Sequence, residues 1–301
     1  MPQTPASSPP PAGPLPPGAG VRPGFLIIGA QKAGTSWLAS RLAGHPEAWL
    51  PPIKEVHYFD GLWNLEMVTA QFNHFLAREV APGRAFNGEI LDFFRRFVLE
   101  GPKDDAWYRG LFTAAGPRLA GEATPAYSIL PPADIARVHA LLPRVKVILL
   151  LRDPLERAWS HFKFDAARHG RNPAIVPLPE ILAHLDSPGN EARTRYLAIL
   201  ENWARGHPGA PLLLAYYDDL RGRPEFLLAA VCRFLGLAYD PGIWGEELGR
   251  VVNPSAAGAP PPAVLLHLAR KYAAEIEVLA SRLGGPVLAW RERCRRVLAG
   301  G

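Results

Sequence analysis

A lysine, Lys32, lies between two glycines in the segment G-A-Q-K-A-G, directly after a short apolar run. That run, residues 25–28, predicts a buried strand, and residues 37–42 carry apolar side chains at helical spacing. Thr35 or Ser36 is predicted to cap this helix. A strand, a glycine-bounded loop and a helix form a cradle for an anion, because loop N–H groups and a helix N-terminus both favour negative charge.

The loop is close to the nucleotide-binding motif G-x-x-x-x-G-K-[ST] but departs from it at one position. Gly29 and Gly34 have the spacing of the motif, whereas Thr35 stands where its lysine should be. The cation of this chain, Lys32, lies inside the loop, nearer to the first anionic group beyond the strand. This departure disfavours an ordinary ATP or GTP enzyme and retains the prediction of a bound phosphate-like group.

A second anion-binding element follows the strongest strand pattern of the chain, residues 145–151. Arg152 comes next, then Asp153 and Pro154 as the predicted N-cap and first residue of a helix. Arginine suits bidentate binding of phosphate, and Ser160, two helical turns on, can add a hydroxyl donor. Two such elements indicate a ligand with two phosphate-like groups.

A third group of polar side chains, Glu55 and His57, lies in the stretch K-E-V-H-Y-F-D. A carboxylate or an imidazole can act as a general base. Two ordinary roles are the alternatives. Glu55 could pair with Lys54 or Arg41 at the surface, and His57 could be a buried histidine with satisfied hydrogen bonds.

The remaining patterns predict the frame that holds these groups. Further strands are expected at 119–123 and 211–217, and helices at 65–78, 104–115, 132–142, 190–206, 225–235 and 263–283. Strands that alternate with helices predict an α/β fold with a mainly parallel sheet. Ligands bind at the carboxyl ends of such strands. This rule places the Lys32 loop, Arg152 and the segment around Glu122 at one crevice.

The size and charge of the chain limit the classes of partner that it is expected to bind. The chain has 301 residues, of which 48% are hydrophobic, and a net charge of +5. This size suits one sizeable domain. The modest positive charge suits an anionic ligand without the basic stripe of a nucleic-acid binder, so no nucleic-acid partner is predicted.

The chain is predicted to consist of a disordered extension rich in proline and glycine, residues 1–23, and one domain, residues 24–301. No apolar run is long enough to span a bilayer, and the first residues lack the basic and apolar regions of a signal peptide. Cys232 and Cys294 have no metal-ligand spacing. These features predict a protein of a reducing, cytoplasmic compartment, and the high usage of Pro, Ala and Arg suggests a genome rich in G and C.

Taken in chain order, the motifs resemble the sulfotransferase family, which uses 3′-phosphoadenylyl sulfate (PAPS). The Lys32 loop is similar to that family's 5′-phosphosulfate loop. The segment V-K-V-I-L-L-L-R-D-P-L-E-R-A-W-S-H-F is similar to its 3′-phosphate motif, with Arg152 and Ser160 at the matching positions. K-E-V-H-Y-F-D resembles the stretch that holds the catalytic glutamate in the heparan sulfate branch, and Y-D-D-L at 217–220 resembles the family's Y-E-D-L. The resemblance spans about residues 24 to 290.

The resemblance implies a P-loop-NTPase-like three-layer fold with a central sheet between helices. It implies in-line transfer of a sulfuryl group from PAPS to a hydroxyl, or as second choice an amine, of a carbohydrate, lipid or natural-product acceptor, with adenosine 3′,5′-bisphosphate as the product. The implied donor-binding residues are Lys32, Ala33, Gly34, Thr35, Ser36, Arg152 and Ser160. The implied catalytic residues are Lys32, Glu55 and His57. The resemblance implies no metal, because the sulfuryl group carries less charge than a phosphoryl group and Lys32 is placed to neutralise the charge that develops.

One departure bears on the acceptor. Residues 123–128 read A-T-P-A-Y-S, whereas the heparan sulfate 3-O branch has K-T-P-S-Y-F. The missing lysine disfavours a glycosaminoglycan acceptor, and the chain has neither the cysteine pair nor the membrane anchor of that branch. A soluble bacterial relative is therefore predicted. Two other function classes stay open, a P-loop kinase of a small molecule and a nucleotide-binding relative without catalysis.

Overall fold

The structure is a computed structural model that describes residues 22–63, 66, 68–70, 72–73, 88–99, 101–250, 252 and 258–300. Every structural statement below concerns these residues. The predicted N-terminal extension lies outside them apart from its last two residues, and so does most of the predicted helix at 65–78.

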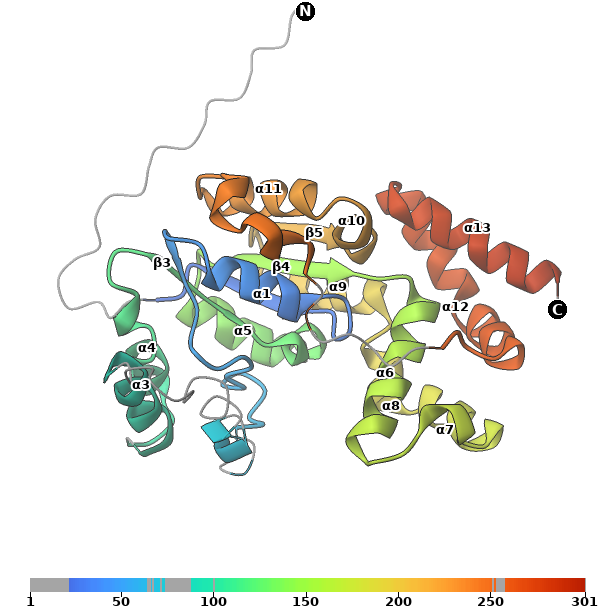
Figure 1. The fold of residues 1–301 in the computed structure, drawn as a ribbon, viewed down its shortest axis with the longest axis horizontal. Helices are drawn as coiled ribbons and strands as arrows, with labels where there is room; N and C mark the ends of the chain where they lie inside the picture. The colour runs from blue at the N-terminus through green and yellow to red at the C-terminus, as the bar shows by residue number, and fades with distance from the viewer. Residues whose placement is uncertain are drawn as a thin grey trace, which may run out of the picture.

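Five strands form one sheet in the order β2-β3-β1-β4-β5, and every pairing is parallel (Figure 1). The strands are β1 (Phe25–Gly29), β2 (Ala48–Trp49), β3 (Leu119–Ala123), β4 (Lys146–Leu151) and β5 (Leu212–Tyr216). The central strands β1 and β4 are buried along nearly their whole length, as continuous apolar runs predict. The predicted α/β class and parallel sheet are confirmed.

Helices cover both faces of the sheet (Figure 1). They are α1 (Thr35–Ala43), α3 (Gly88–Leu99), α4 (Asp105–Gly110), α5 (Pro132–Leu141), α6 (Pro154–Arg168), α7 (Leu178–Leu185), α8 (Pro188–Ala192), α9 (Tyr196–Gly206), α10 (Tyr217–Gly222), α11 (Pro224–Leu235), α12 (Pro262–Leu283) and α13 (Pro286–Ala299). From β1 the chain crosses to β3 on one side and then to β4 on the other, so the right-handed rule for parallel crossovers predicts α1 and α5 on opposite faces. Helix α5 packs on α9 so closely that a Cβ at Gly206 would lie 2.6 Å from Ile135.

Three local predictions are wrong. Gly34, in the left-handed region, is the N-cap of α1, and neither Thr35 nor Ser36 caps it. The predicted helix at 190–206 is two helices, α8 and α9. The predicted helix at 104–115 ends at Gly110 and continues as a 3₁₀ turn at Thr113–Ala115.

Other boundaries agree with the predictions. Asp153 caps α6 by accepting a hydrogen bond from the Leu155 amide (2.8 Å), and Pro154 is the first helical residue. The sequence did not predict strand β2, because two residues are too few to show an alternation of apolar and polar side chains. Within the described ranges, no helix is both long and apolar enough to cross a bilayer.

Candidate active site

The segment between β1 and α1 is shaped as an anion cradle. Lys32 and Gly34 both have positive φ, 72° and 93°. A Cβ at Gly34 would lie 2.5 Å from a methyl carbon of Leu220, so both the conformation and the space at this position require glycine. No side chain caps α1, and its first turn contains no acidic residue. The first N–H groups of the helix are therefore available to an anionic ligand.

Lys32 lies among other cations at this loop. Burial, together with the positive charges of Arg152 and Lys54, lowers the pKa of Lys32 to about 8. Its ammonium is 4.2 Å from the ring centroid of Phe164, which lies on α6. A bound anion would relieve the repulsion among these cations, and phosphate or sulfate is an anion of suitable charge. The residues of the loop thus fit the phosphosulfate end of the expected donor.

Arg152, at the end of β4, contacts the same loop. Its guanidinium donates to the carbonyl of Lys32 (3.1 Å) and lies 4.2 Å from the ring centroid of Tyr217. Its Nε and Nη2 atoms donate to the Glu156 carboxylate (3.3 and 3.1 Å). Among the described residues, no hydrogen bond or ion pair joins Arg152 to the neighbouring Asp153. The structure therefore brings the two predicted anion-binding elements into direct contact.

The last helix holds the start of α6 in place. One guanidinium nitrogen of Arg293, on α13, donates to both Asp153 (3.1 Å) and Glu156 (2.6 Å). On the same helix, Trp290 donates to the carboxylate of Asp218. Because Glu156 is also the partner of Arg152, α13 indirectly fixes the orientation of the arginine at the cradle.

The other predicted donor-binding residues lie on the same two elements. Ala33 and Thr35 are buried in the loop and at the start of α1, Ser36 is half-buried, and Ser160 is buried on α6. Ser160 lies two turns after Arg152, as the spacing predicts.

Glu55 and His57 have an unusual backbone conformation. Their φ angles are 71° and 56°, and with Lys32 they are the non-glycine residues with positive φ in the described ranges. For such residues this conformation costs on the order of 1–3 kcal/mol each, and it persists where surrounding contacts enforce it. All three residues predicted to be catalytic are therefore in conformations that the fold must impose.

Hydrogen bonds to β3 and the turn after it impose the conformation of residues 55–59. The amide of Glu55 donates to the carbonyl of Ala123 (3.0 Å), and the amide of Val56 donates to the Thr124 hydroxyl (3.0 Å). The amides of Tyr58 and Phe59 both donate to the hydroxyl of Tyr127 (2.8 and 3.4 Å). The hydroxyls of Thr124 and Tyr127 thus accept hydrogen bonds from amides that, within a sheet, would donate to the carbonyls of a neighbouring strand.

The buried carboxyl group of Glu122 supports the conformation of residues 55–59. Glu122 accepts hydrogen bonds from Tyr108 (2.6 Å) and from Thr124 (3.0 Å). Burial raises the pKa of Glu122 to about 7. Glu122 and Tyr127 are both buried beneath residues 55–59, so they position that segment.

Charges alternate along this segment. Lys54 forms an ion pair with Glu55, and His57 lies 3.4 Å from Glu55 and 2.7 Å from Asp60. Burial disfavours the charged carboxylate, yet Lys54 and His57 hold the pKa of Glu55 at about 2. Burial likewise favours neutral His57, yet Asp60 and Glu55 raise its pKa to about 9. At neutral pH, Glu55 is therefore an anion and His57 a cation.

Sequence reasoning did not include two residues of this cluster. Asp60 contacts His57 and was detectable as the third residue after it in K-E-V-H-Y-F-D. Arg193 follows α8, and burial lowers its pKa while Asp165, Asp60 and Glu55 oppose that shift. No sequence pattern distinguished Arg193 from the other arginines.

One group of side chains could hold a metal ion. Ligand atoms of His161, Asp165 and His184 lie within 4.8 Å of one another. Burial and the positive charges of Arg157 and Arg193 lower the pKa of His161 to about 3, so its imidazole is neutral. The same guanidinium charges would repel a bound cation, which disfavours a metal at this group.

Comparison with known proteins agrees with this geometry. A model of the sulfotransferase family matches residues 23–241. The chain belongs to the sulfotransferase family. It is 26% identical over 189 residues to the membrane-associated sulfotransferase kil1 of Dictyostelium discoideum, covering 62% of this chain and 30% of that protein. It is 26% identical over 230 residues to heparan sulfate glucosamine 3-O-sulfotransferase 6 of Mus musculus, covering 71% and 52%. The chain thus spans about half or less of the length of these relatives.

Solved sulfotransferase structures share the fold. A sulfotransferase from Alicyclobacillus acidocaldarius aligns with a TM-score of 0.60 and 21% identity, covering 90% of this chain and 99% of that one. A sulfotransferase domain of the Synechococcus PCC 7002 olefin synthase aligns with a TM-score of 0.51 and 20% identity, covering 86% and 97%. These similarities confirm the predicted P-loop-like architecture of the sulfotransferases.

The Tyr127 hydroxyl gives a direct test of how residues 55–59 are held. Tyr127→Phe leaves two backbone amides without their acceptor, which should lower the free energy of unfolding by about 1–3 kcal/mol. The transfer rate should fall as well, because Glu55 and His57 lose their fixed backbone. Urea denaturation and steady-state kinetics measure the two effects. Tyr239→Phe, at a partly exposed tyrosine away from the cleft, is the control. An unchanged rate in Tyr127→Phe would contradict the positioning role.

Proposed function

We propose that this member of the family transfers a sulfuryl group from PAPS to a hydroxyl of a carbohydrate, lipid or natural-product acceptor. The observation that carries the proposal is the contact between the two anion-binding elements, in which Arg152 donates to the carbonyl of Lys32 at an uncapped helix N-terminus. A donor with phosphate groups at both ends matches two adjacent cationic elements.

The donor would be held by residues of the cradle and of α6. Lys32, the amides of residues 33–36 and the hydroxyls of Thr35 and Ser36 would bind the phosphosulfate end. Arg152 and Ser160 would bind the 3′-phosphate. To bind the 3′-phosphate, Arg152 must give up part of its contact with Glu156. A phosphate dianion at this site would favour that exchange electrostatically.

Glu55 is the better candidate for the general base. Its pKa of about 2 keeps it ionised throughout the physiological range, whereas the raised pKa of His57 keeps the imidazole protonated. A protonated imidazole cannot accept a proton. His57 would instead hold the Glu55 carboxylate in place and, as a cation between Glu55 and Asp60, orient it toward the acceptor.

The proposed reaction is an in-line displacement. The acceptor oxygen forms a bond to sulfur as its proton passes to the carboxylate of Glu55. The bond between sulfur and the bridging phosphate oxygen breaks on the opposite side. The ammonium of Lys32 and the loop amides would stabilise the charge that develops on that leaving oxygen, as preorganised donors stabilise an oxyanion.

The kinase alternative is weaker. A P-loop kinase would need a lysine directly after Gly34, where α1 begins with Thr35. A binding protein without catalysis would have no need to hold Glu55 and His57 in a costly conformation. The prediction of a cytoplasmic bacterial protein is retained as part of this proposal, with two buried free cysteines as its support.

Calorimetric titration with adenosine 3′,5′-bisphosphate tests the donor site. We expect micromolar binding of the bisphosphate, because two phosphates meet two cationic elements, and no binding of ATP at the same concentration. Binding of ATP with comparable affinity would favour the kinase. Absence of bisphosphate binding would overturn the proposed donor.

Two substitutions separate the roles of the site residues. Lys32→Ala should weaken bisphosphate binding at least tenfold and lower turnover by about 10²–10³, because it removes the charge that faces the leaving oxygen. Glu55→Gln should lower turnover by about 10²–10⁴ with unchanged bisphosphate affinity. Release of the bisphosphate from PAPS, across a panel of hydroxyl acceptors, reports turnover. The control is Glu201→Gln on the exposed face of α9. Normal turnover by Glu55→Gln would exclude Glu55 as the base.

The pH dependence of kcat/KM distinguishes the two candidate bases. With Glu55 as base and Lys32 required as a cation, kcat/KM should be level through neutral pH and fall above about 8, where Lys32 loses its proton. Lys32→Arg should move this fall to higher pH, since a guanidinium stays charged. A rise of kcat/KM toward pH 9 would instead indicate that neutral His57 is the base.

A further inference from the structure

A fully buried arginine, Arg157, lies in the chain between the two residues proposed to bind the 3′-phosphate. Its exposed fraction is 0%, and it is the largest fully buried side chain among the described residues. It comes five residues after Arg152 and, on α6, three residues before Ser160. Three residues are less than one helical turn. The protein thus encloses a guanidinium group close to the candidate donor site.

The guanidinium group of Arg157 has few hydrogen-bond partners. Its Nη2 atom donates to the backbone carbonyl (3.1 Å) and to the side-chain oxygen of Asn190, on α8. Its Nε and Nη1 atoms have no partner within the described part of the chain. No carboxylate of that part forms an ion pair with Arg157, whereas the buried Arg41 pairs with Glu247 (3.5 Å). Because buried charged groups are almost always paired, this exception needs a physical reason.

The groups around Arg157 do not neutralise it. Tyr196, at the start of α9, and Tyr272, on α12, would stabilise the cation if they were ionised. Burial raises the pKa of both tyrosine hydroxyls, so neither is an anion at neutral pH. The other strongly acting neighbours, Arg193 and Arg152, are cations. Burial lowers the pKa of Arg157 to about 10, which leaves the guanidinium charged at neutral pH.

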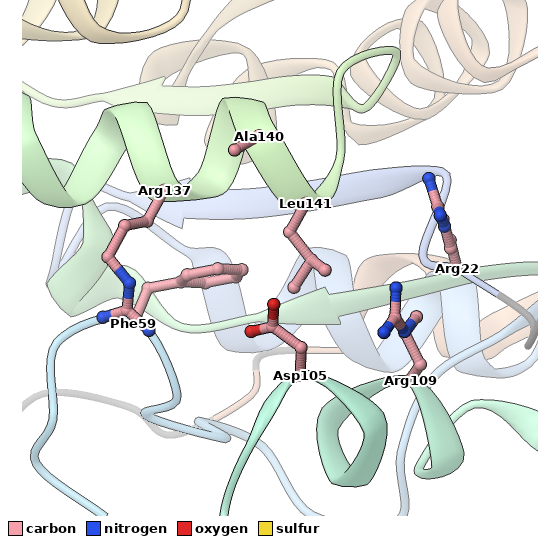
Figure 2. Close-up of a pocket in the computed structure, with 7 residues that line it drawn as sticks. All are labelled: Arg22, Phe59, Asp105, Arg109, Arg137, Ala140 and Leu141. Carbon is pink, nitrogen blue, oxygen red and sulfur yellow. The ribbon is translucent and has the colours of Figure 1, made fainter.

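Other arginines of the fold carry their charge where water reaches it. Arg22, Arg109 and Arg137 line a cavity of about 250 Å³ between α4 and α5, with Asp105 among them (Figure 2). The first and third of these arginines are exposed, so hydration stabilises their charge. Arg157 is fully buried and has no such access. A charge in that position costs free energy, because burial removes the water that stabilises an ion.

The charge of Arg157 acts on both cations of the candidate donor site. It is one of the positive charges that lower the pKa of Lys32, and Arg152 in turn lowers the pKa of Arg157. Tyr196 connects the two arginines, because it lies beside Arg157 and its hydroxyl donates to the Arg152 carbonyl (2.8 Å). Charges interact more strongly inside a protein than in water. A phosphate group bound at Lys32 or Arg152 would therefore be attracted by Arg157 as well.

We propose that Arg157 is a positioning residue for the donor, which it attracts through its charge, beside Lys32 and Arg152, without touching it. This inference rests on the proposed function, because the donor is the one proposed above. In the free protein, the three cations repel one another. The phosphosulfate and the 3′-phosphate of the donor supply the missing negative charge, so this repulsion is relieved when the donor or its bisphosphate product is bound.

The test variant is Arg157→Met in the full-length chain, which removes the charge at a similar side-chain volume. Calorimetric titration should show that adenosine 3′,5′-bisphosphate binds about five- to twentyfold more weakly, because one positive charge is lost from the interior. Urea denaturation without ligand should show an unchanged or higher midpoint, because an unpaired buried charge is removed. Arg41→Met is the matched control. It breaks a buried arginine's ion pair, so it should lower the midpoint and leave bisphosphate affinity unchanged.

The pH dependence of bisphosphate binding is a second measurement, which a role in packing alone would not alter. The charged groups that act on Lys32 are Arg152, Lys54, Asp165 and Arg157. Bisphosphate affinity should fall above about pH 8, where Lys32 loses its proton. Removal of a neighbouring cation raises the pKa of Lys32, so this fall should move to higher pH in Arg157→Met. In Arg41→Met it should stay in place.

The outcomes separate this inference from the proposed function. If Arg157→Met does not fold, Arg157→Gln replaces it in every measurement, and failure of both variants to fold assigns Arg157 to stability and overturns the inference. Unchanged bisphosphate affinity overturns it as well, and so does weaker binding with a lower urea midpoint and an unmoved pH dependence. Each of these results leaves the donor site in place. Absence of bisphosphate binding by the unsubstituted chain overturns the proposed function itself.

Discussion

The site depends on a backbone conformation that its residues would not adopt alone. Lys32, Glu55 and His57 each have positive φ, and each must be held against the preference of an L-amino acid. Neighbouring strands supply the restraint. Lys32 is fixed between β1 and α1, and the other two are bound through the edge of β3 and Tyr127. The parallel sheet therefore does more than bury apolar residues, since its carboxyl edge fixes the backbone of the three residues proposed to be catalytic.

The charge states of these three residues follow from that backbone geometry. Because the backbone folds Glu55 and His57 toward each other, burial is opposed by close ion partners, and both groups are charged at neutral pH. Lys32 has the opposite situation, with cations around it and a lowered pKa. The candidate site thus has a carboxylate at Glu55 on one side and the cations of the Lys32 loop on the other. That division of charge suits a reaction in which a proton leaves one end as negative charge develops at the other.

The sequence predicts the frame correctly and singles out the candidate site residues, because both depend on local patterns. The apolar runs of β1 and β4, the cap at Asp153 and the glycines around Lys32 are all short-range signals. Long-range contacts were not predictable. The contact of Arg152 with the Lys32 carbonyl joins residues 120 positions apart, and the Tyr127 hydroxyl reaches Tyr58 across 69. The left-handed conformation of Glu55 also has no sequence signal, since glutamate rarely adopts it.

The contact of Arg293 with Asp153 and Glu156 has a consequence for how the protein is made. Residues 25–152 supply both anion-binding elements, yet the orientation of Arg152 depends on a side chain near residue 300. During synthesis, the sheet strands leave the ribosome well before α13 does. The nascent chain can thus form its sheet early, whereas Arg152 reaches its final orientation only after α13 has been translated and has docked on α12.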